Sequence, residues 1–147
     1  MVDMRSAVLA MTALAAVSVG AFAVVGNAAD RPNGAGAQTF GVSESDFHIA
    51  APGTLRAGPV TFRVHNKGPD SHELILVRVG SSGLPLRRDG LSVDEDALEH
   101  ETAGSLEPGG PGVTRKLKVR LSRGRYEFLC NMSGHFMGGM HSVLVVR

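Results

Sequence analysis

The segment that decides the fold runs from Tyr126 to His141 and has the sequence YEFLCNMSGHFMGGMH. It contains the only cysteine of the chain, Cys130, and then His135 and Met140 at successive intervals of five residues. Glycines lie between these three residues and allow the backbone to turn tightly. A thiol, an imidazole and a thioether are therefore expected to converge in one short loop between two strands.

These three side chains are soft metal ligands of the kind that suits copper. With a second imidazole they form the trigonal site with a weak axial thioether that is used for electron transfer. The segment from Asn66 to Leu74, NKGPDSHEL, offers that imidazole, because His72 follows a Gly-Pro-Asp turn and precedes an apolar strand.

The pattern Cys-x4-His-x4-Met, after the strand YEFL and before a short terminal strand, resembles the small blue copper proteins, the cupredoxins. Its spacing is most similar to that of their rusticyanin-like and sulfocyanin-like members. The resemblance implies one type 1 copper ion per chain, held by His72, Cys130, His135 and Met140. It implies that the Cys130 thiolate supplies the electron-delocalising bond, that the two histidines complete the plane, and that Met140 tunes the potential.

Several features of the site stay open at this point. Met132 and Met137 compete with Met140 for the axial position. Many cupredoxins have an asparagine directly after the upstream histidine, where its side chain ties the two ligand loops together, whereas this chain has Glu73. Four residues separate the cysteine from the downstream histidine, against two in the plastocyanin-like members, so the loop can take a different shape.

Composition limits the remaining possibilities. The 147 residues suffice for one domain. Outside the first 29 residues, which contain one Arg and one Asp, the chain has fourteen Lys or Arg and thirteen Asp or Glu, so bulk charge does not favour nucleic-acid binding. A single cysteine excludes an internal disulfide, and an unpaired cysteine in an exported protein is accounted for by metal ligation.

The N-terminus predicts export. Arg5 precedes an apolar run from Ala7 to Val25, which is followed by the small-residue site Gly26-Asn27-Ala28. We expect residues 1–28 to be a signal peptide cleaved after Ala28, with an uncleaved membrane anchor as the alternative. Residues 29–39 are predicted to be a flexible tether, and residues 40–147 a copper-binding domain outside the cytoplasm, whether periplasmic, secreted or anchored to the membrane.

The remaining sequence predicts strands. Phe40–Val42 and Phe47–Ala50 are expected on either side of a connector, residues 43–46. The alternation of Val60, Phe62 and Val64 with polar residues indicates a strand with one buried face. The continuous apolar run Leu74–Val79 is typical of a strand buried on both faces.

A single helix is predicted in the part of the chain between residues 80 and 112. Ser92 and Glu95 form a capping-box pattern at the start of the acidic segment Ser92–His100, whose acids are interpreted as a solvated face. Beyond it, Lys116, Lys118 and Arg120 indicate a strand with one basic face. The whole pattern predicts an all-β fold, an antiparallel Greek-key β-sandwich of seven or eight strands with one helical excursion.

The functional prediction is a monomeric carrier of single electrons, not an enzyme, that meets redox proteins through an apolar surface around His135. The residues expected on this surface are Gly134, Phe136, Met137, Gly138 and Gly139. If the electron leaves elsewhere, the basic strand face is the next candidate. A copper storage or delivery protein is the alternative, because methionines and His141 crowd the ligand loop. An enzyme with Cys130 as nucleophile is disfavoured, because no third orienting residue can be named. His48, His100 and His141 are expected to face solvent.

Overall fold

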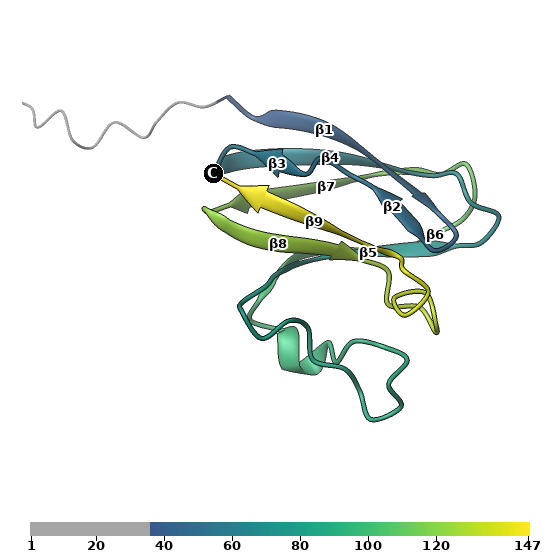
Figure 1. Ribbon diagram of the computed structural model, residues 1–147. Coiled ribbons are helices and arrows are strands. Elements are labelled where there is room, and N and C mark those ends of the chain that lie inside the picture. The colour runs from purple at the N-terminus through teal and green to yellow at the C-terminus, as the bar shows by residue number, and fades with distance from the viewer. Residues whose placement is uncertain (1–35) are drawn as a thin grey trace, which may run out of the picture. The chain divides into compact units, whose positions relative to one another are not determined.

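A computed structural model describes residues 36–147, which form strands and one short 3-10 helix (Figure 1). The elements are β1 Gln38–Ser45, β2 His48–Ala50, β3 Thr54–Leu55, β4 Gly58–Asn66, β5 His72–Arg78, η2 Asp96–Leu98, β6 Thr102–Gly109, β7 Thr114–Leu121, β8 Gly124–Leu129 and β9 His141–Val146. The predicted leader and residues 29–35 of the predicted tether lie outside these residues. Strand β1 begins two residues before the expected domain boundary. Over residues 36–147, no helix has the length and apolar character needed to cross a membrane.

The strands form two sheets, which confirms the predicted β-sandwich. One sheet has the order β2-β1-β4-β7 and the other has the order β3-β9-β8-β5-β6. Most neighbouring strands are antiparallel, but β1 pairs in parallel with β4, and β3 pairs in parallel with β9. These two parallel pairs, which the antiparallel prediction did not include, arise where the chain moves from β2 to β3 in the other sheet and then returns to β4.

The core lies between the two sheets. Val60, Phe62 and Val64 of β4 are buried as their alternation predicted, and the Phe62 ring meets the Phe128 ring of β8 edge to face at 5.0 Å. Apolar residues of both sheets and Cys130 belong to the same buried cluster. The end of this core is therefore continuous with the segment that carries the cysteine.

Strand β5 of the second sheet is buried on both of its faces. Ile75 and Val77 of β5 point away from the main core and pack with Val93 and Leu98 of the long connection between β5 and β6. Figure 1 shows this connection, with η2 in it, lying beside β5 and β8 on the side away from the first sheet. This packing explains why β5 is a continuous apolar run.

The helix prediction was wrong in its extent and its cap. Only one 3-10 turn, Asp96–Leu98, forms, and the side chain of its N-cap residue, Glu95, makes no capping hydrogen bond. The Ser92 hydroxyl donates to Asp89 at 3.5 Å instead of capping a helix. Glu95 accepts a hydrogen bond from the Asn131 amide at 2.6 Å, so this acid holds the connection to the ligand loop and is not merely a solvated group.

The predicted connector at residues 43–46 is mostly strand. Strand β1 continues through Ser45, because the Glu44 side chain points into the sandwich and pairs with Arg115 of β7 at 2.5 Å. One charged residue in a strand interrupts the apolar pattern without interrupting the strand. The actual turn between β1 and β2 is confined to Asp46 and Phe47.

Candidate metal centre

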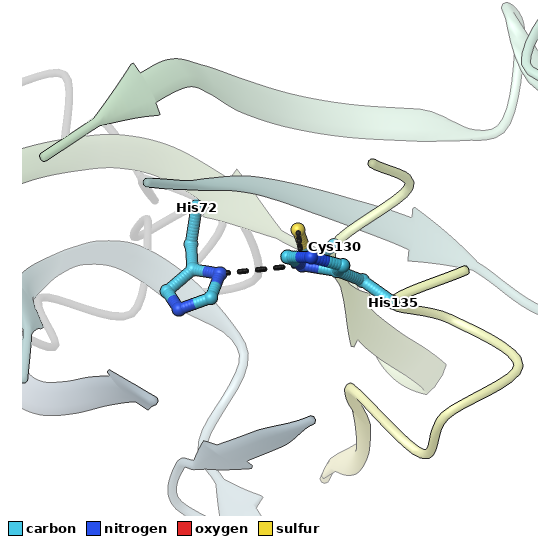
Figure 2. A group of neighbouring side chains, drawn as sticks. All are labelled: His72, Cys130 and His135. Atoms are coloured by element: carbon cyan, nitrogen blue, oxygen red, sulfur yellow. Dashed lines mark hydrogen bonds between the residues drawn. The ribbon is translucent and has the colours of Figure 1, made fainter. Parts of the chain in front are cut away.

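Three of the predicted ligands converge at one end of the sandwich. His72 is the first residue of β5, Cys130 follows the last residue of β8, and His135 lies in the loop that leads to β9. Their ligand atoms all lie within 4.8 Å of one another. His72 Nδ1 lies 3.3 Å from His135 Nδ1, and Cys130 Sγ lies 3.5 Å from the same nitrogen (Figure 2).

These separations fit a single metal ion. A typical first-row ion, such as zinc, bonds imidazole nitrogen at about 2.0–2.1 Å and thiolate sulfur at about 2.3 Å. At angles of about 110–120°, two such nitrogens are then about 3.3–3.6 Å apart, and a nitrogen and a sulfur are about 3.5–3.8 Å apart. The observed 3.3 and 3.5 Å lie at the short end of these ranges. One sulfur and two nitrogens of neutral imidazoles are a donor set suited to copper.

The ligand loop closes on itself through backbone hydrogen bonds. The Cys130 N–H donates to the Met140 carbonyl at 3.1 Å, and the Met140 N–H donates to the His135 carbonyl at 2.9 Å. Gly134 and Gly139 have φ values of 78° and 103°, which side chains rarely adopt, so glycine is required at these two turns. The loop is thus compact enough to bring its donors together.

Burial separates the three candidate methionines. Met140 is fully buried in the same cluster as Cys130, Met132 is partly buried at the edge of that cluster, and Met137 is 53% exposed. A thioether that shares an ion with the buried Cys130 must itself lie inside the protein. Burial therefore favours Met140, as the spacing did.

Glu73 ties the two ligand segments together. Its Oε1 accepts a hydrogen bond at 3.0 Å from the backbone N–H of Asn131, the residue after Cys130. Burial raises the pKa of the Glu73 carboxyl, the nearby Glu95 raises it further, and the Asn131 hydrogen bond lowers it. A carboxylate thus makes the link between ligand loops that the sequence left in question.

Asp46 contacts the other nitrogen of the upstream histidine, which the sequence did not reveal. Its Oδ1 lies 3.1 Å from His72 Nε2. Burial lowers the pKa of His72, the neighbouring His135 lowers it further, and Asp46 opposes both. Because a carboxylate only accepts, Nε2 carries the proton and Nδ1 keeps the lone pair that a metal needs.

Cys130 is a protonated thiol when no cation is close to it. Burial raises the pKa of this thiol, and hydrogen bonds to the backbone at Met132 and Glu73 only partly offset that effect. A metal ion favours the thiolate through its charge. The buried cysteine is therefore suited to metal ligation and poorly suited to act as a free nucleophile at neutral pH.

Asn66 shapes the turn that leads to His72, and it was also missed. Its side-chain amide donates to the carbonyls of Asp70 at 2.7 Å and Gly109 at 2.8 Å, while its Oδ1 accepts from the Gly68 N–H at 2.9 Å. The only signal in the sequence was its position at the start of an Asn-Lys-Gly-Pro turn, where asparagine commonly bonds the backbone two residues on.

The other histidines lie outside the cluster. His48, His100 and His141 are exposed, as predicted. His141 pairs with Glu127 at 2.7 Å and its ring lies 5.0 Å from that of Phe136. The predicted basic strand face is also present, since Lys116, Lys118 and Arg120 of β7 are exposed.

Comparison with known proteins identifies the fold. No protein-family model and no curated protein sequence matches the chain. Among solved structures, auracyanin A, titled a "blue" copper protein from Chloroflexus aurantiacus, is similar over 76% of this chain and 100% of its own, with 21% identity and a TM-score of 0.57. Reduced auracyanin from Roseiflexus castenholzii is similar over 75% of this chain and 97% of its own, with 20% identity and a TM-score of 0.54. An azurin from Methylomonas sp. strain J is similar over 75% of this chain and 98% of its own, with 18% identity and a TM-score of 0.54.

The sequence resemblance is thereby confirmed for the fold, and His72, Cys130 and His135 lie together where the resemblance implied. This chain has the cupredoxin fold.

Proposed function

We propose that this protein is a blue copper protein that carries single electrons between redox partners. The observation that carries the proposal is the convergence of His72 Nδ1, Cys130 Sγ and His135 Nδ1 within 4.8 Å at the end of a sandwich core. Its support from comparison is the fold shared with auracyanins and an azurin, one of which is titled a blue copper protein.

His72, Cys130 and His135 would be the main ligands of the ion, and the Met140 thioether would be its weaker ligand. Copper, when bound, supplies a centre that accepts and releases one electron at a time. The protein holds the donors in place: His72 and Cys130 sit at the ends of adjacent strands, and the closed loop fixes His135. Such fixed donors favour fast electron exchange, because the site does not have to rearrange when the charge changes.

A partner would dock on the apolar surface around His135. His135 is half-buried, Met137 and Phe47 are 53% and 52% exposed, and Gly138 and Gly139 are also exposed to solvent. Phe136, which the prediction placed on this surface, packs instead against the second core cluster. A small apolar contact is the kind that redox proteins form and break quickly.

The basic face of the first sheet is a second candidate for docking. Arg63 lies directly opposite Lys116 in the β4–β7 register, and a cross-strand pair of like charges is unfavourable by itself. Lys118 and Arg120 extend the same exposed face along β7. An acidic partner would relieve this repulsion.

The alternative function is storage or delivery of copper. It is supported by Met132, Met137 and His141, which lie in or next to the ligand loop as additional soft donors. A storage protein would bind Cu(I) preferentially and release it to a chelator, whereas a carrier would retain copper through repeated cycles of oxidation and reduction.

The structure gives little support to an enzyme that uses Cys130 as a nucleophile. Cys130 is fully buried, and burial raises the pKa of its thiol. A surface recess of about 540 Å³ lined by Arg78, Leu84 and Gly124 lies at the other end of β5 and β8 from the cysteine. A substrate bound in that recess could not reach the thiol.

We further propose that the domain works outside the cytoplasm as a monomer. The support is the apolar run from Ala7 to Val25 and the small-residue site that follows it. The first test is to find whether the mature chain in the cell envelope begins after Ala28.

The test of function is the visible spectrum after addition of Cu(II) to the purified apoprotein. We expect an intense thiolate-to-copper absorption at one copper per chain. Cys130→Ser should remain folded and lose that absorption, because the band requires the sulfur. A wild-type protein that retains copper but stays colourless would rule out the electron carrier and favour storage.

A further inference from the structure

The turn between β1 and β2 has an unusual backbone. Phe47 has a φ of 58°, and it is the only non-glycine residue with a positive φ in residues 36–147. This conformation is unfavourable for a bulky side chain and persists only where the surroundings hold it. Phe47 is also 52% exposed, so burial of its ring is only a partial compensation. The conformation therefore calls for another explanation.

The ring of Phe47 packs on the ligand loop. It meets the His135 ring edge to face, with centroids 5.6 Å apart and planes at 61°. A β-carbon added at Gly138 would overlap the Phe47 ring, and one added at Gly139 would lie 3.6 Å from the Phe47 carbonyl oxygen. Gly138 thus leaves the space that this phenylalanine occupies next to the histidine.

The neighbouring residue contacts the other histidine. Asp46 Oδ1 lies 3.1 Å from His72 Nε2 and 3.5 Å from the Asp70 N–H, which donates to it. A β-carbon at Gly68 would lie 2.7 Å from the same Oδ1 and 2.8 Å from His72 Nε2. Glycine at this position therefore keeps the carboxylate and the imidazole in direct contact.

We propose that the Asp46-Phe47 turn is a clamp that sets both histidine donors in their metal-binding orientation before the metal arrives. Asp46 fixes the tautomer of His72, leaving Nδ1 free, and Phe47 fixes the ring of His135 from outside. Successive side chains of an extended strand point to opposite faces, so two adjacent residues reach both imidazoles only because the backbone turns at Phe47. Both are positioning residues, and their role rests on the proposed copper function.

The first experiment uses the apoprotein, so that it is decided independently of copper. Histidine-ring ¹⁵N NMR at pH 7.5 should show His72 as the Nε2–H tautomer in the wild type. Asp46→Ala should convert it to a mixture of tautomers, whereas Asp46→Asn, which keeps an acceptor oxygen, should preserve the Nε2–H form. An unchanged His72 tautomer in Asp46→Ala overturns the role of Asp46, even if the protein proves to bind no copper.

The second experiment measures Cu(II) affinity by competition with a chelator. Loss of a residue that orients a ligand typically costs about 10–100-fold in metal affinity, and we expect that loss for Asp46→Ala. Phe47→Gly should lose at least about tenfold, although glycine accepts the positive φ without strain. A role confined to the turn backbone predicts no loss in this variant. The matched control is Leu91→Gly, since Leu91 is 51% exposed and belongs to the distant β5–β6 connection.

The third experiment measures the reduction potential, which separates the effect of ligand orientation from the effect of charge. Asp46→Asn keeps the hydrogen bond but removes a negative charge close to the site, so it should weaken Cu(II) binding more than Cu(I) binding. A tenfold difference between the two corresponds to a rise of about 59 mV in the reduction potential.

If Phe47→Gly binds copper as tightly as Leu91→Gly does, the clamp is refuted for His135. If wild type itself binds no copper, the proposed function fails, while the tautomer result still stands.

Discussion

Replacing Glu73 by alanine should loosen the link between the two ligand segments, and its cost can be worked out from one hydrogen bond. Glu73 Oε1 accepts from the Asn131 backbone N–H at 3.0 Å, and Asn131 is only 9% exposed. Without this acceptor, the N–H becomes a buried donor with no hydrogen-bond partner, because water has little access to it. The loss should lower the free energy of unfolding of the apoprotein by about 1–3 kcal/mol.

The same substitution should weaken copper binding, because Asn131 follows Cys130 directly and its hydrogen bond fixes the backbone next to the thiolate. Loss of a group that positions a ligand in this way should lower the affinity for copper by about 10–100-fold. Glu73→Gln is the matched control, since it keeps an oxygen acceptor and removes only the charge. Burial and Glu95 already raise the pKa of Glu73, which means that they disfavour its charged form, so the glutamine should cost less than about 0.5 kcal/mol.

Urea unfolding of both apoproteins at pH 7.5, and chelator competition for Cu(II), measure the two effects. The reasoning predicts that alanine lowers both stability and affinity, whereas glutamine leaves both near the wild type. Equal losses in the two variants would show that the charge of Glu73, rather than the hydrogen bond to Asn131, matters. Unchanged stability and affinity in Glu73→Ala would show that the ligand loops hold together without this link.

Three further predictions concern the axial ligand, the docking surface and a buried ion pair. Met140→Leu should keep the copper absorption and raise the reduction potential by about 59 mV, which corresponds to a tenfold loss of affinity for Cu(II) relative to Cu(I). Met137→Leu should leave the potential unchanged. The reverse result in cyclic voltammetry would make Met137 the axial ligand. Met137→Lys should slow electron self-exchange by about tenfold or more, because the two added charges repel each other at the contact. The rate is measured by NMR line broadening at low salt, and the copper absorption and the reduction potential should stay nearly unchanged. An unaffected rate would make the basic sheet face the next candidate for docking. Burial raises the pKa of Glu44 to about 7 despite its contact with Arg115, so the folded state binds this proton more tightly than the unfolded state does. The stability that this proton contributes is therefore fully present below pH 4.5 and is lost as the pH rises towards 7. The difference in unfolding free energy between Glu44→Gln and the wild type should therefore shift in favour of the variant by on the order of 2 kcal/mol between pH 5 and pH 8 in urea titrations, and a constant difference would show that Glu44 stays ionised throughout.

Local patterns in the sequence were enough to predict the β-sandwich and the ligand loop. The alternation of Val60, Phe62 and Val64 follows from the two-residue period of a strand, and it reports burial directly. The spacing of Cys130 and His135 within one loop leaves their donor atoms little room to separate. His72 was found because it lies at a strand entrance, as its turn predicted.

Extents and caps were less predictable, because weak local preferences compete with packing. The capping-box pattern at Ser92 and Glu95 did not form a helix cap, since Glu95 bonds the Asn131 amide instead. The charge of Glu44 suggested a connector, but its pairing with Arg115 allows the strand to continue. In each case a distant partner supplied an interaction that local sequence does not contain.

The donor types, their spacing and the alternating pattern of the strands can be predicted from the sequence alone, because these depend on residues near one another in the chain. The groups that surround the donors come from distant parts of the chain and could be identified only in the folded protein. Asp46 reaches His72 across 26 residues, Glu73 reaches Asn131 across 58, and Glu44 reaches Arg115 across 71. Such contacts depend on which strands pair and in which direction, including the parallel pairing of β1 with β4, and no local periodicity encodes that choice.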